Sequence, residues 1–387
     1  MYMDNFVYSI PTKIYFGKGQ VKHIGDIVST YGKRVLLVYG GGSIKRNGIY
    51  DDVTSICKEA GITYFELSGV EPNPRITTVR KGVEICRREN IDVVLAIGGG
   101  SSIDCAKVVA GSVSYEGDAW DIVLDPSKVV SVLPIVSILT LSATGSEMDT
   151  FAVISDMETN DKVGTSHEDM RPKASILDPS YTFSVPAYQT AAGTADIMSH
   201  ILECYFSNVH GYMQDRMAEG LLKTCIQFGV KAIEHPEDYE ARANLMWASS
   251  WAINNFIKLG KAVEWSVHPM EHQLSAYYDI THGVGLAILT PHWMEHVLNN
   301  ETLHKFRDYG INVWGIDADK DPFEIAHEAI RCTKEYFMKM NIPMTLRAVG
   351  IDETHFDIMA EKACVGLEHA FVPLTKEDVK KIYQASL

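Results

Sequence analysis

The N-terminal half of the chain contains a series of almost uninterrupted apolar runs. The clearest of them lie at residues 34–39, 92–98 and 132–139. Helical patterns separate these runs, at residues 48–60, 76–89 and 102–110. Apolar runs that alternate with helices are typical of parallel strands that are covered on both faces of a sheet. We therefore predict a mostly parallel, Rossmann-like α/β domain, whose strand-to-helix loops gather along one edge of the sheet.

The character of the sequence changes after about residue 185. Residues 151–155 and 162–164 still have the pattern of a hairpin. Beyond them helical periodicity replaces the strand pattern, and it is clearest at residues 216–232, 239–259, 302–314, 322–340, 352–363 and 376–385. We therefore expect two domains, an α/β dinucleotide-binding domain at residues 1–183 and an all-α domain at residues 184–387.

The composition argues against several classes of partner. The formal net charge is −15, so we expect neither nucleic acid nor an anionic membrane surface as a partner. No window approaches the ~18–20 apolar residues that a membrane-spanning helix needs. Seven cysteines are scattered along the chain without a C-x-x-C pair. This pattern argues against a disulfide framework or a zinc ribbon, and it favours the reducing cytoplasm.

A glycine-rich turn follows the apolar run at residues 92–98. It contains the candidate phosphate-binding residues Gly98, Gly99, Gly100 and Ser101. Glycines in such a turn let a phosphate approach backbone N–H groups at a helix N-terminus. The turn is not a complete G-x-G-x-x-G motif, because Ile103 stands where the third glycine would be. A nucleotide loop and an ordinary tight turn are therefore both open, and Asp104 is explained equally well as a favourable charge near a helix start.

Two further loops offer groups that bind phosphate or ribose. The first follows residues 34–39 and contains Gly40, Gly41, Gly42, Ser43 and Lys45. A nucleotide fold that prefers NAD usually has a carboxylate at the end of this strand. This strand has none there, so we predict NADP(H), with NAD(H) as the alternative; a solvated basic turn would also explain the loop. The second loop, from Thr140 to Thr144, offers hydroxyl donors, which turn chemistry alone also explains.

A helical pattern in the second half places a carboxylate and an imidazole one turn apart. Asp196 and His200 are the fourth and last residues of the segment Gly-Thr-Ala-Asp-Ile-Met-Ser-His. They project from one helix face, as a chelating pair or as a surface coincidence. Together with His268 and His282 they would suit Fe(II) or Zn(II). The competing interpretation takes residues 268–272 as the H-x-x-E-H pattern of a metallopeptidase, although Pro269 weakens the helical register that this pattern requires.

Taken together, these segments resemble the iron-containing (group III) alcohol dehydrogenases, particularly the clostridial-type NADPH-dependent butanol dehydrogenases. The matching segments run nearly from end to end. They are Tyr-Gly-Gly-Gly-Ser-Ile-Lys from Tyr39, Gly-Gly-Gly-Ser-Ser-Ile-Asp-Cys-Ala-Lys from Gly98, Leu-Ser-Ala-Thr-Gly-Ser-Glu-Met from Leu141, Gly-Thr-Ala-Asp-Ile-Met-Ser-His from Gly193, and residues 268–282.

The resemblance implies a dinucleotide domain and a helical metal domain of the dehydroquinate synthase-like fold. It implies that the metal is held by Asp196, His200, His268 and His282. It also implies that His272 lies near the nicotinamide without binding the metal, and that the cofactor site is lined by Asp104, Thr140, Thr144 and Lys162. The implied reaction is hydride transfer between NADP(H) and a short-chain primary alcohol or aldehyde, such as butanol or butanal. We also expect a homodimer.

One segment departs from the family. Relatives carry a glycine-rich stretch before the last helix, whereas residues 363–372 of this chain keep one glycine and add His369, which leaves the preferred substrate size open. Besides the metallopeptidase, a non-redox enzyme of the dehydroquinate synthase type is an alternative. It would need a basic pocket for a phosphorylated substrate, and no sequence near Phe151 or Trp265 suggests one.

Overall fold

The structure, a computed structural model, describes residues 3–387 and divides into two compact units. The α/β unit comprises residues 9–185 and 236–246, and the helical unit comprises residues 186–235 and 247–387 together with the described residues before position 9. The main boundary between the two units, after residue 185, lies two residues from the predicted boundary after residue 183. The sequence prediction had, however, assigned the N-terminal residues to the α/β domain and residues 236–246 to the helical domain.

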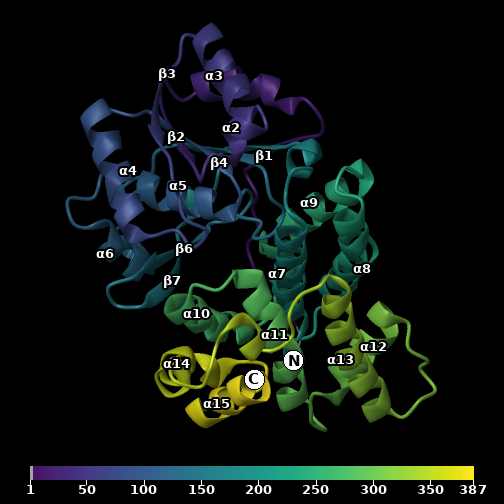
Figure 1. Ribbon diagram of the computed structural model, residues 1–387. Coiled ribbons are helices and arrows are strands. Elements are labelled where there is room, and N and C mark those ends of the chain that lie inside the picture. Colours follow the sequence, from purple (N-terminus) through teal and green to yellow (C-terminus); the bar gives the residue numbers. More distant parts are fainter. Residues whose placement is uncertain (1–2) are drawn as a thin grey trace. The chain divides into compact units, whose positions relative to one another are not determined.

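A six-stranded sheet forms the centre of the α/β unit, in the order β1-β8-β5-β4-β2-β3 (Figure 1). Its strands are β1 (Lys13–Phe16), β2 (Arg34–Tyr39), β3 (Thr63–Leu67), β4 (Val93–Gly98), β5 (Ile135–Leu139) and β8 (Ala174–Leu177). Every pair of neighbours is parallel, which confirms the predicted sheet. The predicted hairpin is also present, as the antiparallel pair β6 (Phe151–Asp156) and β7 (Asp161–Ser166).

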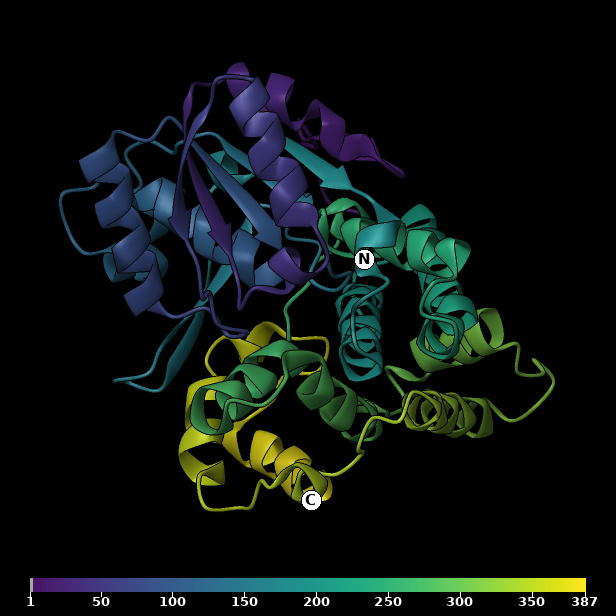
Figure 2. The same ribbon diagram turned by 45° about the horizontal axis from the view of Figure 1, so that its top comes forward.

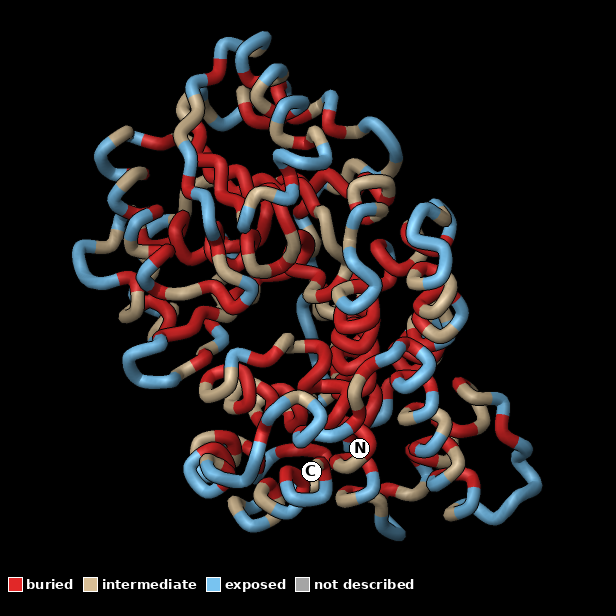
Figure 3. Tube along the Cα trace, in the orientation of Figure 1, coloured by how far each residue is buried: buried red, intermediate tan, exposed pale blue. Residues whose placement is uncertain are grey.

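Helices cover both faces of this sheet. Successive strand residues point to opposite faces, and both faces of β2 carry apolar side chains that must be buried. Leu36 and Val38 of β2 pack in one apolar cluster with residues of α4 (Ile76–Glu89) and α5 (Gly100–Ser112). Val35 and Leu37 pack in the other cluster, with α1 (Ile24–Ser29) and α3 (Ile49–Glu59). Figure 2 shows helices on both sides of the strands, and Figure 3 shows the strands as buried. The strands therefore need apolar residues at nearly every position, as the sequence has.

The remaining short elements of the α/β unit lie in its connections. They are α2 (Ser43–Arg46), α6 (Ala119–Leu124), and the 3₁₀ helices η1 (Gln20–His23), η2 (Pro126–Lys128), η3 (Glu168–Met170) and η4 (Pro179–Thr182). The helix α9 (Tyr239–Ile253) begins in this unit and ends in the helical one. Its Met246 packs in the same apolar cluster as α4 and α5, which explains why residues 236–246 belong with the sheet.

The helical unit contains helices only, as far as residues 3–8, 186–235 and 247–387 are described. Its helices are α7 (Ala187–Tyr205), α8 (Tyr212–Glu234), α10 (Val267–Tyr278), α11 (His282–Val297), α12 (Leu303–Trp314), α13 (Pro322–Lys339), α14 (Phe356–Ala363), α15 (Lys376–Ala385), and the 3₁₀ helices η5 (Phe256–Lys258), η6 (Arg347–Val349) and η7 (Leu367–His369). Within residues 3–387, no helix is long and apolar enough to cross a membrane.

The helix α7 forms the core of this unit. Every residue from Thr190 to Tyr205 is buried, which Figure 3 shows as a continuous red helix. The N-terminus of α11 packs directly on α7, where a side chain at Gly283 would collide with the carbonyl oxygen of Ala192. A charged or polar side chain on such a helix is costly unless a partner compensates it, so the polar residues of α7 indicate a site.

Candidate functional site

Three imidazole rings of the helical unit converge on one carboxylate oxygen. The Nε2 atoms of His200, His282 and His268 lie 3.5, 3.7 and 3.9 Å from Oδ1 of Asp196. Ligand atoms of Asp196, His268 and His282 also lie within 4.8 Å of one another, a spacing that allows them to share one ion. The structure therefore brings together all four residues that the sequence singled out as metal ligands.

Three helices supply these side chains. Asp196 and His200 come from adjacent turns of α7, and His268 lies in the first turn of α10. His282 is the first residue of α11. Asp279 ends α10 in a left-handed conformation with φ 50°, a geometry that Asp tolerates better than most residues, and the chain then turns into α11. The sequence thus places the last predicted ligand at a helix start.

The centre has the unsatisfied polar atoms that a cation would satisfy. Asp196 is 3 % exposed and His268 is 8 % exposed, yet Oδ1 of Asp196 and Nε2 of His268 have no hydrogen-bond partner among the described residues. Burial lowers the pKa of His200 to about 3, which keeps its imidazole neutral and able to donate a lone pair. One carboxylate oxygen and three imidazole nitrogens fit a divalent metal such as Fe(II) or Zn(II).

Glu203 positions His268 and also caps the N-terminus of α10. Its carboxylate accepts hydrogen bonds from the backbone N–H groups of Ser266, Val267 and His268, at 2.5, 2.9 and 3.2 Å. It also bonds to Nδ1 of His268, which leaves Nε2 facing Asp196. The sequence reasoning missed Glu203, although its spacing from Asp196 and His200 places it on the same side of α7.

Glu271 is engaged by side chains rather than presented to a substrate. It is completely buried, its Oε2 pairs with Nδ1 of His282, and its Oε1 accepts a hydrogen bond from Ser275 Oγ. A metallopeptidase base must reach an attacking water, so this geometry argues against the H-x-x-E-H interpretation.

His272 and Trp265 border the centre. The ring of His272 lies 5.7 Å from that of His282 and 6.2 Å from that of His268, measured between centroids. Trp265 contacts His200 and His268 edge-on, at 5.7 and 4.8 Å between centroids. His272 therefore lies beside the group of residues around Asp196, and its implied place near the nicotinamide stays a prediction. Trp265 adds an aromatic side chain that sequence reasoning had not assigned.

Two of the predicted cofactor loops meet in the α/β unit. The helix α5 begins at Gly100, directly after β4, so its first N–H groups lie at the end of a strand. A side chain at Gly100 would collide with Thr144, and the N–H of Thr140 donates to the carbonyl of Gly98 at 2.9 Å. The absent side chain thus allows the loop at residues 140–144 to lie against the glycine turn.

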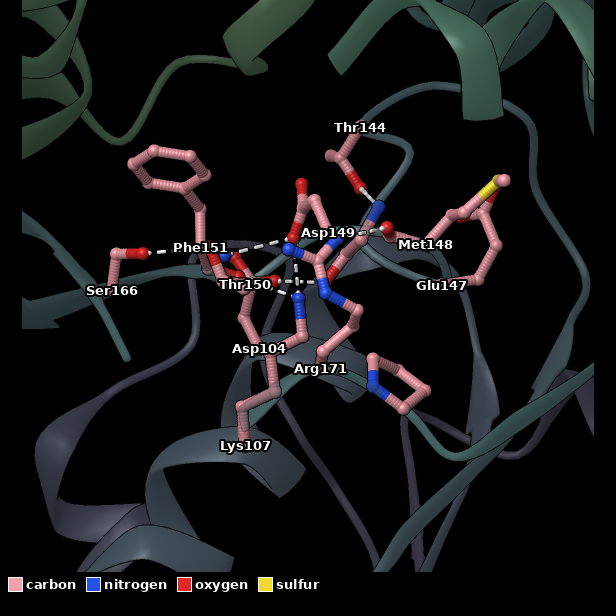
Figure 4. A network of polar contacts seen from close by, with 12 residues as sticks. Asp104, Lys107, Thr144, Glu147, Met148, Asp149, Thr150, Phe151, Ser166 and Arg171 are labelled. Atoms are coloured by element: carbon pink, nitrogen blue, oxygen red, sulfur yellow. Dashed lines mark hydrogen bonds and ion pairs between the residues drawn. The ribbon is translucent and has the colours of Figure 1, made fainter. Parts of the chain in front are cut away.

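Behind these loops lies a buried network of charged side chains, shown in Figure 4. Asp104 accepts hydrogen bonds from Ser146 Oγ at 2.6 Å and from the N–H of Val153 at 2.9 Å. Burial raises the pKa of Asp104 to about 6, against the opposing effect of Lys107. Asp104 therefore links α5 to the loop and to β6 by hydrogen bonds. The sequence had suggested only a charge near a helix start or a cofactor-site residue. Lys162, on β7, is also buried.

The loop that begins at Gly40 has an acidic neighbour that the sequence reasoning missed. Nζ of Lys45 lies 3.4 Å from Oε2 of Glu66 on β3. Tyr39 and Tyr50 both donate hydrogen bonds to the same carboxylate. Because β3 is the sheet neighbour of β2, Glu66 reaches a loop that follows β2, although 21 residues separate it from Lys45.

Both parts of the chain match known protein families. Residues 11–179 match the family described as "Iron-containing alcohol dehydrogenase", and residues 190–387 match "Fe-containing alcohol dehydrogenase family, C-terminal". The chain belongs to the iron-containing alcohol dehydrogenase family. This confirms the resemblance that the motifs had indicated, and membership makes the chain a metal-dependent alcohol dehydrogenase that uses a nicotinamide cofactor.

Relatives of this iron-containing alcohol dehydrogenase are similar over their whole length. NADH-dependent butanol dehydrogenase A of Clostridium acetobutylicum is 64 % identical, over 99 % of this chain and 100 % of the relative. NADPH-dependent aldehyde reductase YqhD of Escherichia coli is 35 % identical, over 99 % and 100 %. The solved structure of NADH-dependent butanol dehydrogenase A from Thermotoga maritima is 39 % identical and superimposes with a TM-score of 0.95, over 100 % of this chain and 99 % of the other.

Proposed function

We propose that this chain interconverts short-chain primary alcohols and aldehydes, of the butanol and butanal type, by hydride transfer to or from a nicotinamide cofactor. The observation that carries the proposal is the convergence of three imidazole nitrogens on the buried carboxylate of Asp196. The similarity to butanol dehydrogenases and to an aldehyde reductase supports the substrate class. A non-redox reaction has no comparable support among these relatives.

We assign the metal-binding role to Asp196, His200, His268 and His282. When bound there, Fe(II) or Zn(II) would act as a Lewis acid towards the carbonyl or alcohol oxygen of the substrate. Glu203 holds the ring of His268, and Trp265 packs edge-on against His200 and His268. We assign His272 the role of carrying a proton on its imidazole nitrogen to or from the reacting oxygen, through water or a ribose hydroxyl.

We assign the cofactor to the glycine loops of the α/β unit. The N–H groups at the start of α5 would bind its phosphates, with Ser101, Thr140 and Thr144 nearby. A helix N-terminus favours such an anion because its N–H groups are unsatisfied and its dipole is positive there. Gly40, Gly41, Gly42 and Ser43 would then contact the adenine ribose, as the strand order of this fold class places them beside that loop.

The first prediction tests the function itself. NADH or NADPH should be oxidised on addition of butanal, and a metal chelator should abolish the reaction, because the substrate oxygen would lose its Lewis acid. The reaction is measured by the absorbance of the reduced nicotinamide, which falls as the cofactor is oxidised. A rate that survives prolonged chelation, or a chelator-sensitive cleavage of peptides without any nicotinamide, would contradict the proposal.

For the cofactor we now propose NADH as the preferred form. The sequence predicts NADP(H) because β2 has no carboxylate at its end, but Glu66 of the neighbouring strand β3 brings a carboxylate to this loop and pairs with Lys45. A 2′-phosphate would therefore meet a lysine that is already paired and a carboxylate that repels it. The NADH-dependent relatives at 64 % and 60 % identity support this choice.

The second prediction follows from that pairing. Glu66→Gln removes the negative charge and releases Lys45, so kcat/KM for NADPH should rise while kcat/KM for NADH stays near its original value. A charge-assisted hydrogen bond to a phosphate is worth roughly 1.5–3 kcal/mol, which corresponds to about a tenfold to a hundredfold gain. Glu59→Gln, at an exposed position of the same unit, removes the same charge and serves as the control. An unchanged ratio of the two cofactors in Glu66→Gln would show that Glu66 does not set the preference.

The remaining parts of the proposal concern the assembly and its compartment. We propose a homodimer in the cytoplasm. All seven cysteines, at positions 57, 86, 105, 204, 225, 332 and 364, are free thiols, which suits a reducing compartment. Light scattering of the purified protein measures the mass of the assembly, and a monomeric mass would contradict the dimer.

A further inference from the structure

We infer that Glu271 is a positioning residue that fixes the tautomer and the direction of His282, and that it thereby sets how tightly the candidate centre holds its cation. This inference rests on the metal site of the proposed function. It gives Glu271 a role different from the peptidase base that its motif had suggested.

Two side-chain contacts and the space at a glycine fix the position of the Glu271 carboxylate. Glu271 lies on α10, is completely buried, and its Oε1 accepts a hydrogen bond from Ser275 Oγ at 2.5 Å. Its other oxygen pairs with Nδ1 of His282. A Cβ on Gly285 of α11 would lie only 2.8 Å from Cγ of Glu271, so the glycine provides the space in which this carboxylate reaches His282.

The contact decides which nitrogen of His282 faces the centre. A neutral imidazole carries one proton, and the nitrogen that donates it cannot bind a metal. Because a carboxylate oxygen accepts the proton of Nδ1, the lone pair lies on Nε2, the atom 3.7 Å from Asp196 Oδ1. A carboxylate in this place also makes the ring a stronger donor to a metal.

Glu271 allows a cleaner test than Glu203 does. Glu203 binds His268, but it also accepts hydrogen bonds from three backbone N–H groups at the start of α10, so replacing it would disturb the helix itself. The two contacts of Glu271 described above both run to side chains. Glu271→Gln keeps the shape and one acceptor oxygen, removes the charge, and replaces the other oxygen by an amide NH2 group.

The experiment measures metal affinity, independently of turnover. The full-length chain is stripped of metal and then titrated with Zn(II) in competition with a chromophoric chelator, for the wild type and for Glu271→Gln. Loss of a carboxylate behind a histidine ligand typically costs about 10–100-fold in metal affinity, and we expect a loss of this size. Ser275→Ala removes the hydroxyl that holds the other oxygen, so we expect a smaller loss in the same direction. The exposed Glu264→Gln serves as the control and should bind like the wild type.

Two further readings separate positioning from a general loss of structure. The circular dichroism of metal-free Glu271→Gln should match that of the wild type, and excess Zn(II) should restore its butanal reduction. Equal Zn(II) affinity in the wild type, Glu271→Gln and Ser275→Ala would overturn the inference and leave the proposed centre intact. A wild-type chain that takes up no cation would overturn the centre and the inference together.

Discussion

We expect His282→Ala to lose its bound metal and its dehydrogenase activity together. The substitution removes one of the three Nε2 atoms that converge on Asp196, and it leaves the buried carboxylate of Glu271 without its imidazole. Loss of a partner behind a ligand alone costs about 10–100-fold in metal affinity, so loss of the ligand itself should cost at least about a hundredfold. Elemental analysis after gel filtration, combined with the rate of butanal reduction, measures both effects in one preparation.

His272→Ala is the matched comparison for this result. Its ring lies beside that of His282, yet it is not among the residues assigned to the metal. The variant should therefore keep its metal and react more slowly, by about 10²–10⁴-fold if its imidazole carries the proton, which is the usual size of general acid–base catalysis. Metal loss in His272→Ala with metal retained in His282→Ala would show that the ligands have been assigned to the wrong histidines.

We expect Lys107→Met to destabilise the α/β unit severely. Lys107 has no exposed surface, and its Nζ lies 2.6 Å from Asp149 Oδ1 and donates to the carbonyl of Phe151 at 2.7 Å (Figure 4). Burial already raises the pKa of Asp149, and Lys107 opposes that effect most strongly. Removing one partner of a buried ion pair leaves an uncompensated charge and costs about 3–5 kcal/mol of unfolding free energy.

Urea unfolding monitored by circular dichroism measures this loss. Lys58→Met, at an exposed position of α3, is the control, and we expect it to change the unfolding free energy by no more than about 0.5 kcal/mol. Adding Asp149→Asn to Lys107→Met removes the unpaired charge and should recover part of the lost stability. If Lys107→Met were as stable as Lys58→Met, the network would not stabilise the fold in the way that its burial indicates.

The sheet was predictable because its signal is local. The strands at residues 34–39 and 93–98 are apolar on both faces, which only a sheet covered on both sides requires. The assignment of residues 236–246 was not predictable in the same way. These residues continue into a helical pattern, and only the packing of Met246 among sheet-covering helices assigns them to the α/β unit.

The candidate centre shows the same division between local and distant information. The spacing of Asp196 and His200 on one helix was visible in the sequence, and the family motifs supplied His268 and His282. The carboxylates behind the histidines were not visible in this way, because Glu203 meets His268 across 65 residues and Glu271 meets His282 across 11. The pairing of Glu66 with Lys45 joins neighbouring strands, and no pattern within either segment reveals it.

We propose that this chain oxidises and reduces its substrate at a metal held by Asp196, His200, His268 and His282. The most direct test is to strip the enzyme anaerobically and return Fe(II) in small steps while the oxidation of NADH by butanal is followed. The rate should rise in proportion to the bound metal and level off at about one ion per chain, as expected for a site with a single set of four ligands. A full rate in protein that elemental analysis shows to be free of metal would contradict the claim.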